Sequence, residues 1–482
     1  MKKTSNPFIY IASLMVALMF FVGCSDEESY TSSPASPLKF SEDTLKFDTV
    51  FTNIGSSTQW LKVFNPNSDG VRLNSISLAS GGRSGFYINV DGQSGTAFTN
   101  VEIAHKDSIF VFVEVNVDPT NEDSPVLIED SIVFTHQNGA RQYVHLLAYG
   151  QDVIILDHIC FENDTTLAAT RPFLIYDSLV VASGCTLTLA EGTNLYFHAK
   201  ASLLVHGSLH SEGSLEHPVV MRGDRLDRMF DYLPYDRLDA QWGGVWLAPE
   251  STDNIIDFTD IHSGSYGIYC NGTESEQRQL TLTNSTIHNV AGSGLSLNLC
   301  TAFVANCQIS NANLYCIDIL GGYADFVHCT IAQFYPWKQY GAALKLTNTR
   351  NDTIVDLHRA AFYNCYVTGG QEDEIYGEKA SESQYTDVLF NYHFENCVLA
   401  TVIAEDDTNF VACTLDTLEH HADNFHTIDT ENYIYDFRLD SASVARSKAS
   451  DSFLDRYPTD RNGVERKPGN VDAGCFQYFK EN

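Results

Sequence analysis

Short bursts of alternating apolar and polar residues fill the chain between residues 38 and 152. Residues 108–115 read SIFVFVEV and residues 143–149 read YVHLLAY, and turn-forming clusters such as NPNSDG at 65–70 stand between the bursts. A period of two residues predicts β-strands that bury one face. About six or seven such strands in a segment of this length are typical of an immunoglobulin-like β-sandwich.

From about residue 171 the pattern changes to a repeated phrase: a polar residue, a small residue, any residue, and then Ile, Val or Leu. Ser285, Cys307 and Cys329 hold the same place in three phrases and follow one another at intervals of 22 residues. A period in the twenties, with β-branched residues and no helical pattern, indicates a parallel β-helix whose coils stack about 4.8 Å apart. The phrase occurs as NSTI at 284–287, NCQI at 306–309, HCTI at 328–331, NCYV at 364–367, NCVL at 396–399 and ACTL at 412–415.

Equivalent positions of stacked coils form columns. We expect the Asn that opens the phrase, as at Asn306 and Asn364, to occupy a tight turn, because Asn tolerates the left-handed backbone conformation. We expect the Cys that follows to point inward as a small apolar side chain. The chain has twelve cysteines, and eleven remain when Cys24 is set aside. This odd number and the inward placement together predict that they are free, buried thiols. A disulfide between neighbouring coils is the alternative. The sequence contains no CxxC pair, so it does not indicate a zinc or redox motif.

The N-terminus has the organisation of an export signal. Lys2 and Lys3 precede an apolar run at 8–22, which has the length of a signal-peptide core and is short for a membrane span. Gly23-Cys24, followed by SDEE at 25–28, resembles the lipobox and acidic export tag of Bacteroidetes lipoproteins. The resemblance implies acylation of Cys24, by palmitate among other chains, and a lipid anchor in the outer membrane that faces the cell exterior. The alternative is an ordinary signal peptide in which Cys24 occurs by chance.

Three further stretches resemble right-handed parallel β-helix lipoproteins, namely residues 203–222, residues 241–268 and the C-terminal run at 460–474. In the last, CFQ at 475–477 stands where the family has Ala-Tyr-Glu. Within residues 38–152, the runs DTVF at 48–51, VFN at 63–65 and AYG at 148–150 resemble the ASPM-SPD2-Hydin class of Ig-like domains, which are usually spacers or adhesive modules. The predicted fold class is all-β, with an N-terminal Ig-like β-sandwich followed by a right-handed parallel β-helix solenoid. The predicted domains are a signal peptide at 1–23, an acidic, Ser-rich tether at 24–37, the sandwich at 38–152, the β-helix at 153–440 and a C-terminal cap at 441–482.

The formal net charge is −33. A surface this acidic repels nucleic acid and anionic membrane faces, and it argues against a strongly anionic polysaccharide as ligand. We therefore expect an extracellular glycan or a surface protein as partner, and no nucleic acid.

The longest insertions between the repeated phrases fall in two adjacent coils, between residues 331 and 397. Aromatic rings offer flat apolar faces with polar edges, which suits sugar stacking. We predict that Tyr335, Trp337 and Tyr340, with Arg350, bind the ligand. The alternative is that the rings pack back onto the solenoid.

A run of carboxylates follows in the next insertion. Glu372, Asp373 and Glu374 would offer the hard oxygens that calcium takes. Their spacing matches no known calcium loop, so a solvated acidic loop is the alternative. No cofactor other than calcium is expected.

These features favour a surface-exposed lipoprotein whose β-helix binds a glycan or another macromolecule without catalysis. The first alternative is a β-helix polysaccharide lyase or glycoside hydrolase. A lyase needs a base, and a cation beside the substrate carboxylate, for which Lys345, Arg350 and His358 lie in the inserted region. A hydrolase needs two carboxylates, for which Asp318 and Asp325 are candidates. The second alternative is a structural or adhesin protein.

Overall fold

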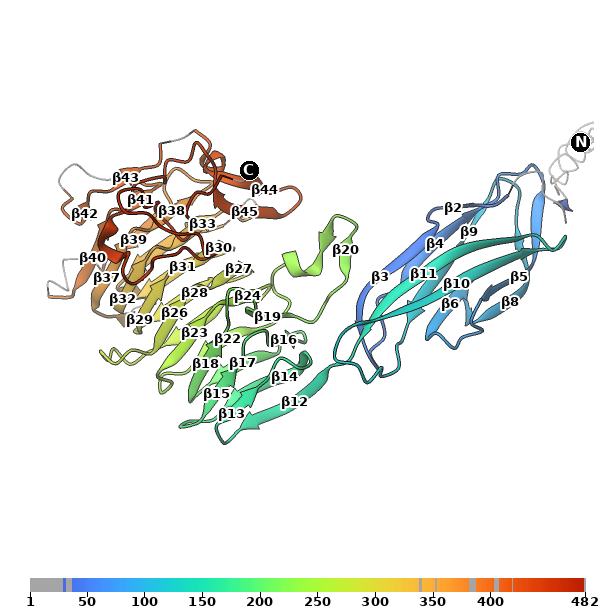
Figure 1. Cartoon of the computed structure of the whole chain (residues 1–482), viewed down its shortest axis with the longest axis horizontal. Coiled ribbons are helices and arrows are strands. Elements are labelled where there is room, and N and C mark those ends of the chain that lie inside the picture. Colours follow the sequence, from blue (N-terminus) through green and yellow to red (C-terminus); the bar gives the residue numbers. More distant parts are fainter. Residues whose placement is uncertain are drawn as a thin grey trace, which may run out of the picture. The chain divides into compact units, whose positions relative to one another are not determined.

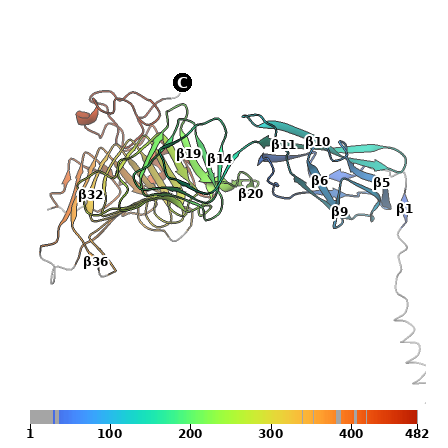
Figure 2. The ribbon, with the colours of Figure 1, turned by 90° about the horizontal axis from the view of Figure 1, so that it is seen from below.

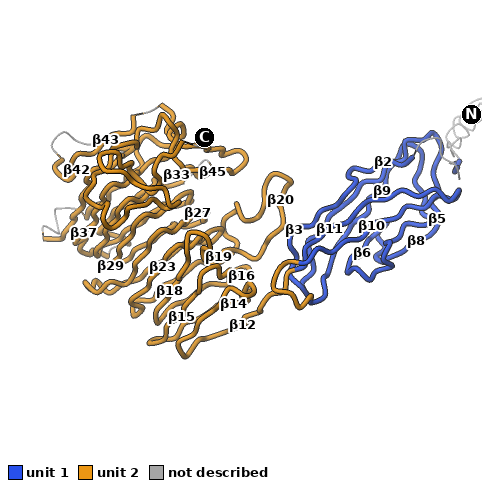
Figure 3. Tube along the Cα trace, viewed as in Figure 1, with its two compact units in different colours: residues 1–119, 126–150 blue, residues 120–125, 151–482 orange. Residues whose placement is uncertain are grey.

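The structure is a computed structural model (Figure 1). It describes residues 29–31, 37–337, 340–351, 353–380, 387–402, 407–417 and 419–480. The chain divides into two compact units, one formed by Met1–Pro119 with Val126–Gly150 and the other by Thr120–Pro125 with Gln151–Asn482 (Figure 3). Cys24 lies outside the described residues. Within the described part of the chain, no helix has the length and apolar character needed to cross a bilayer.

The first unit is a β-sandwich of two mainly antiparallel sheets. Alternation along β4 and β9 places Leu61, Val63, Val111 and Val113 in the core between the sheets, while ring side chains such as Trp60 face solvent. One sheet has the order β1-β5-β10-β11-β3 with β8 on β5, and the other has the order β2-β4-β9-β6-β7. The strands are β1 (Tyr30–Thr31), β2 (Lys39–Phe40), β3 (Thr44–Phe51), β4 (Gln59–Phe64), β5 (Gly70–Leu78), β6 (Phe86–Val90), β7 (Gln93–Gly95), β8 (Ala97–Ile103), β9 (Ser108–Val115), β10 (Val126–His136) and β11 (Arg141–Gln151).

The second unit is a solenoid of stacked parallel strands, which Figure 1 shows as successive coils. An 18-stranded and a 10-stranded parallel sheet run along it. The larger sheet contains β12 (Ile154–Phe161), β14 (Phe173–Val181), β16 (Asn194–Phe197), β17 (Ser202–Val205), β19 (Val219–Gly223), β22 (Gly244–Leu247), β24 (Thr259–His262), β25 (Ile268–Asn271), β27 (Thr286–Val290), β28 (Leu295–Asn298), β30 (Gln308–Ala312), β31 (Ile317–Leu320), β33 (Thr330–Gln333), β34 (Leu344–Thr347), β38 (Tyr366–Gly369), β39 (Ile375–Glu378), β41 (Val398–Leu399) and β43 (Thr414–Leu415). The smaller contains β13 (Thr165–Leu167), β15 (Thr186–Leu189), β18 (Ser208–Glu212), β23 (Asn254–Asp257), β26 (Leu280–Thr283), β29 (Thr301–Ala305), β32 (Gly322–Val327), β37 (Leu357–Tyr363), β40 (Phe390–Glu395) and β42 (Phe410–Val411).

Three strands make one coil, and strands one coil apart pair in register. β24 pairs with β27 and then β30, β25 pairs with β28 and then β31, and β26 pairs with β29 and then β32. We refer to these three faces as the β24, β25 and β26 ladders. The sandwich and the parallel solenoid together confirm the predicted fold class, whereas the assignment of the sandwich to the ASPM-SPD2-Hydin class stays a prediction.

The repeated phrase forms a turn and an inward column, as its spacing predicts. Asn284, Asn306 and Asn364 have φ angles of 49°, 58° and 55°, in the left-handed region, and the Asn306 amide donates to Asn284 Oδ1 at 2.7 Å. All eleven cysteines of the described residues are free, and those of the phrase at Cys307, Cys329, Cys365 and Cys397 are buried as predicted. The prediction of burial is wrong for Cys160, which is exposed, and for Cys185 and Cys413, which are partly exposed. Short side chains here let the coils stack closely, so the turn and the column belong to one structural repeat.

In the described part of the chain, three segments with secondary structure of their own leave the coils. The loop after β19 carries β20 (Arg228–Phe230), β21 (Leu233–Pro234) and the 3-10 helix η1 (Tyr235–Arg237). A short hairpin, β35 (Thr349–Arg350) with β36 (Thr353–Ile354), follows β34, and Figure 2 shows it standing out from the coils. After the last coil, η2 (His421–Asn424) leads into the hairpin of β44 (Phe425–Asp429) and β45 (Ile434–Leu439), and η3 (Asp451–Phe453) follows.

Within the segment predicted as a cap, residues 441–482, the described residues 441–480 run along the edge formed by the Asn turns. Arg466 is buried and its Nη2 donates to Asn306 Oδ1 at 2.7 Å, and the Gly474 amide donates to the Asn364 carbonyl at 2.8 Å. The Cys475 amide donates to Thr330 Oγ1 at 3.0 Å. These contacts belong to three different coils, so the segment ties the coils together from the side.

Candidate functional site

A pocket of about 330 Å³ lies on the outer side of the β24 ladder. Side chains of β24, β27 and β30 form its floor, η1 contributes Asp236 and Arg237, and the hairpin β44–β45 contributes aromatic rings that include Tyr433 and Tyr435. Because side chains alternate along a strand, each coil presents every second residue to this pocket and buries the others in the core.

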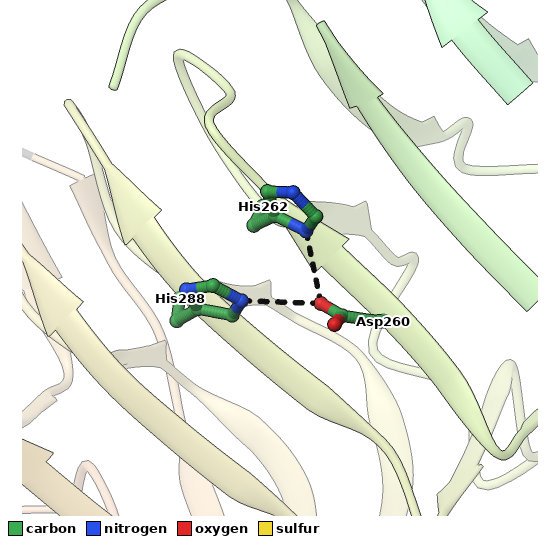
Figure 4. Close-up of side chains that lie close together, drawn as sticks. All are labelled: Asp260, His262 and His288. Carbon is green, nitrogen blue, oxygen red and sulfur yellow. Dashed lines mark hydrogen bonds and ion pairs between the residues drawn. The ribbon is translucent and has the colours of Figure 1, made fainter. Parts of the chain in front are cut away.

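Asp260, His262 and His288 meet on the pocket floor (Figure 4). Asp260 Oδ1 accepts hydrogen bonds from His262 Nδ1 at 3.0 Å and from His288 Nε2 at 3.2 Å. Parallel register places His262 beside His288, and their rings stack with centroids 4.8 Å apart and an interplanar angle of 18°. Two adjacent coils therefore supply two imidazoles around one carboxylate.

The electrostatics of this group favour an ionised carboxylate beside a neutral imidazole. Burial acts to raise the pKa of Asp260, but the neighbouring His262 and His288 outweigh it and hold the pKa well below its ordinary value. Burial lowers the pKa of His262 despite the nearby carboxylate, and its side chain is 9% exposed. At neutral pH the group thus offers an anionic oxygen and, on the far nitrogen of the His262 ring, a lone pair that can accept a proton.

Three polar atoms at this pocket are buried without a hydrogen-bond partner in the described part of the chain. They are Asp236 Oδ1, Thr286 Oγ1 and Tyr435 Oη. A buried polar atom left unpaired costs about 1–3 kcal/mol, so native proteins usually satisfy such atoms with a ligand or ordered water. Their gathering at one pocket marks it as a place where a polar ligand is expected.

The predicted aromatic loop lines a smaller recess that shares Arg237, Asn289 and Tyr433 with this pocket. Tyr335 is buried, and its hydroxyl donates to the Asp239 carboxylate. Trp337 is 56% exposed, and its ring centroid lies 6.2 Å from that of Tyr433 in an edge-on arrangement.

The two rings of this loop therefore differ. Tyr335 packs back onto the solenoid, which is the alternative given above for the aromatic loop. Trp337 faces solvent and has the geometry of a stacking surface. Tyr340 is half-buried, and burial raises the pKa of its hydroxyl. It is not among the residues that line either recess.

Arg350 and Lys345 lie on a different face, the β25 ladder and its β35–β36 hairpin. Arg350 Nη2 contacts both carboxylate oxygens of Asp318, and Lys345 Nζ lies 3.1 Å from Glu378. Burial raises the pKa of Asp318, while Arg350 and Lys345 oppose the rise. Carboxylates already engage both cations, so neither stands free for a substrate carboxylate.

His358 is separate again, on β37 in the β26 ladder. Its ring stacks on Tyr323 with centroids 4.6 Å apart, and its Nε2 lies 3.4 Å from Glu274. The three residues proposed for a lyase therefore do not converge. Asp325, the second hydrolase candidate, pairs with Arg359 on the β26 ladder, whereas Asp318 lies on the β25 ladder.

The three acidic residues proposed for calcium lie in different environments and do not point to one ion. Glu374 is fully buried and accepts the backbone N–H groups of Ala343 at 2.7 Å and Gln371 at 2.8 Å. Asp373 accepts the Thr401 hydroxyl at 2.6 Å, and Glu372 is exposed. They do not form one of the groups of converging ligand atoms found among the described residues.

No local motif contains the residues of the pocket floor, because the two histidines stand 26 positions apart along the chain. The repeat itself nevertheless indicates that they lie side by side. TDIH at 259–262 and STIH at 285–288 occupy neighbouring coils, and the strand register aligns the two histidines. Alignment of the coils, in place of a search for local ligand spacing, would have brought His262 and His288 together.

The comparison with protein families agrees with this architecture. A family model described as a right-handed β-helix region matches residues 266–422. No curated protein matches the chain.

The similar solved structures include a protein of unknown function from Porphyromonas gingivalis W83, with 13% identity and a TM-score of 0.19, covering 27% of this chain and 61% of that one. They also include a family 123 glycoside hydrolase from Clostridium perfringens, with 8% identity, a TM-score of 0.18 and coverages of 25% and 30%. A third is the ASH/PapD-like domain 7 of human CEP192, with 10% identity, a TM-score of 0.17 and coverages of 27% and 94%. The chain spans about three-fifths of the length of the first of these, and at such scores none of them bears on function.

Proposed function

We propose that this protein is a lipid-anchored, surface-exposed β-helix that binds an extracellular glycan through the pocket on the β24 ladder, without catalysis. The observation that carries the proposal is the trio of buried, unpartnered polar atoms, Asp236 Oδ1, Thr286 Oγ1 and Tyr435 Oη, at one pocket. A polyhydroxylated ligand supplies donors and acceptors on every side, so it would satisfy such atoms together.

The walls of the pocket support a sugar over an apolar ligand. Tyr433 borders both recesses, and Trp337 extends the aromatic rim into solvent. Rings at the rim with hydrogen-bonding groups at the floor match the two surfaces of a pyranose, one apolar and one polar. The pocket volume of about 330 Å³ lies within the range of small-ligand sites. The net charge of −33 favours a neutral over an anionic glycan.

The location rests on the N-terminal sequence. The basic start, the apolar run and Gly23-Cys24 before an acidic stretch support lipidation of Cys24 and display on the outer membrane. The Ser- and Thr-containing tether and the sandwich would then lift the β-helix away from the bilayer. Incorporation of labelled palmitate into the full chain, and its loss in Cys24→Ser, tests this part. Labelling that persists in the variant would refute it.

A panel of neutral polysaccharides, run as affinity electrophoresis with the soluble chain from Ser25 and with calcium present, tests binding. We expect one glycan to retard the chain and Trp337→Ala or Tyr433→Ala to weaken binding by about fivefold, since a stacking ring contributes roughly 1 kcal/mol. Trp60→Ala is the matched control, because Trp60 is 54% exposed in the other unit. Equal binding by all variants would refute the assignment of the glycan site to this pocket.

One observation supports the alternative that the protein is an enzyme. Asp318, Arg350, Lys345 and Glu378 gather acidic and basic groups on one coil face, and the Tyr315 and Tyr376 rings flank Lys345. Recovery of the glycan at reduced length after incubation would replace the binding role by a lyase or hydrolase role. Retardation by no glycan in the panel would favour a protein partner and an adhesin role.

A further inference from the structure

We propose that Asp260, His262 and His288 bind one divalent transition-metal ion at the floor of the β24-ladder pocket. The proposal does not depend on the glycan, since binding of the metal alone can be measured. The donor atoms would be Asp260 Oδ1, His262 Nδ1 and His288 Nε2, which all lie within 4.8 Å of one another.

The spacing of the donors suits such an ion. Zinc lies about 2.0–2.2 Å from imidazole nitrogen and carboxylate oxygen, so two ligands on a tetrahedral edge stand roughly 3.3 Å apart. The carboxylate oxygen of Asp260 lies 3.0 Å from His262 Nδ1 and 3.2 Å from His288 Nε2. An ion would replace the two N–H protons that the carboxylate accepts, and each imidazole would then carry its proton on its other nitrogen.

The setting of the group is also that of a metal site. Thr286 is 5% exposed, and its Oγ1 is unpartnered among the residues described. Strand register places it directly beside Asp260, one coil along. Thr286 therefore leaves an unsatisfied buried hydroxyl next to the proposed ion. Three protein ligands with one position open to a pocket are typical of catalytic and ligand-binding metal sites.

The donor set selects the class of ion. Two imidazoles and one carboxylate suit zinc, cobalt and iron(II), whereas calcium and magnesium take oxygen ligands almost alone. A second group, Glu274, Asp356 and His358, has one imidazole, and none of its atoms is both buried and unpartnered. That group therefore serves as an internal control.

The test uses the untagged chain from Ser25, stripped with a chelator and dialysed against Zn²⁺ or Co²⁺. We expect about one metal per chain by elemental analysis and, with Co²⁺, visible absorption of the intensity typical of four-coordinate cobalt. His262→Ala and His288→Ala should each weaken Zn²⁺ binding by about a hundredfold or more, whereas His358→Ala should leave it unchanged.

Folding of the variants has to be separated from metal loss. His288 is 26% exposed, so His288→Ala is the milder change, and its circular dichroism and thermal unfolding without metal should match those of the parent. His288→Cys should restore zinc binding, since a thiolate is also a good zinc ligand. Absence of stoichiometric metal from the parent, retention in both alanine variants, or loss in His358→Ala would each overturn the proposal.

Discussion

Arg350 Nη2 lies 2.8 Å from Oδ1 and 2.7 Å from Oδ2 of Asp318, and this pair fixes the β35–β36 hairpin to the β25 ladder. The Asp318 side chain is 12% exposed and that of Arg350 is 30% exposed. A carboxylate so far removed from water requires a cation nearby, and removal of that cation leaves a charge with little solvation.

We therefore expect Arg350→Gln to lower the free energy of unfolding by about 1–3 kcal/mol at neutral pH, less than for a fully buried pair because Arg350 is partly solvated. Burial already raises the pKa of Asp318, and loss of Arg350 would raise it further. A raised carboxyl pKa costs stability only at pH values where the group must ionise. The loss should thus shrink as the pH falls toward the ordinary pKa of Asp and be absent below it, as urea unfolding over pH would show.

Arg359→Gln is the control for this change, because Arg359 and its partner Asp325 are 52% and 36% exposed. It should cost less than about 1 kcal/mol. A loss in Arg350→Gln that is equal at every pH would contradict the proposed link to Asp318 ionisation.

Glu374 gives the fold a second dependence on pH. Burial raises its pKa to about 7 from an ordinary value of 4.5, against the opposing effect of the Gln371 and Ala343 amides. Because the pKa is raised on folding, the stability it contributes is complete below pH 4.5 and is lost as the pH rises through about 7. The loss amounts to about 3 kcal/mol.

Glu374→Gln should flatten this pH dependence, while it lowers stability somewhat at acidic pH because an amide presents one acceptor oxygen to two backbone N–H groups. Glu372→Gln, on the exposed neighbour, should leave the slope as in the parent. Chemical denaturation of the three proteins across this range of pH measures the effect. Parallel curves for the parent and Glu374→Gln would show that Glu374 titrates normally.

The turn and the cysteine column could be predicted from the sequence because they are local and repeated. Asn306 and Cys307 meet the same neighbours one coil away, so one period of spacing defines both the backbone conformation and the direction of the side chain. The left-handed φ of Asn306 follows from the tolerance of Asn for that region, with no tertiary information.

The pocket could not be predicted in this way, because its walls come from distant parts of the chain. Arg237 Nη1 donates to the Asn432 carbonyl at 3.1 Å, across 195 residues of sequence. Tyr433 and Tyr435 reach the pocket only because the β44–β45 hairpin folds back over the coils. The burial of Tyr335 has the same origin, since its hydroxyl bonds to Asp239, 96 residues earlier.

Cys270 and Cys300 are both buried, and the Cys300 sulfur lies against the Cys270 sulfur and carbonyl. Burial raises the pKa of the Cys300 thiol, so neither residue offers an accessible thiolate to an oxidant while the chain is folded. We therefore expect oxidised glutathione, added to the folded protein, to leave both as thiols and to modify the exposed Cys160. Thiol labelling after unfolding, followed by mass spectrometry of the peptides, checks this. A disulfide between Cys270 and Cys300 would contradict it.

Four phenylalanine rings form a column through the core of the last coils. The centroids of Phe326 and Phe362 are 4.7 Å apart, those of Phe362 and Phe394 are 4.7 Å apart, and those of Phe394 and Phe410 are 5.0 Å apart. Phe362→Ala would empty a fully buried site and break the column on both sides, so we expect a loss of about 3–5 kcal/mol.

Because each coil contacts mainly its neighbours, the loss in Phe362→Ala should appear first as opening of the C-terminal coils. Hydrogen exchange should rise in β37, β40 and β42 before it rises in β15 and β18. Phe230→Ala, at a site 53% exposed in the loop after β19, is the matched control and should change neither stability nor exchange in the coils. A uniform rise in exchange along the whole solenoid would show that the coils unfold as one unit, and that the column does not hold the C-terminal end alone.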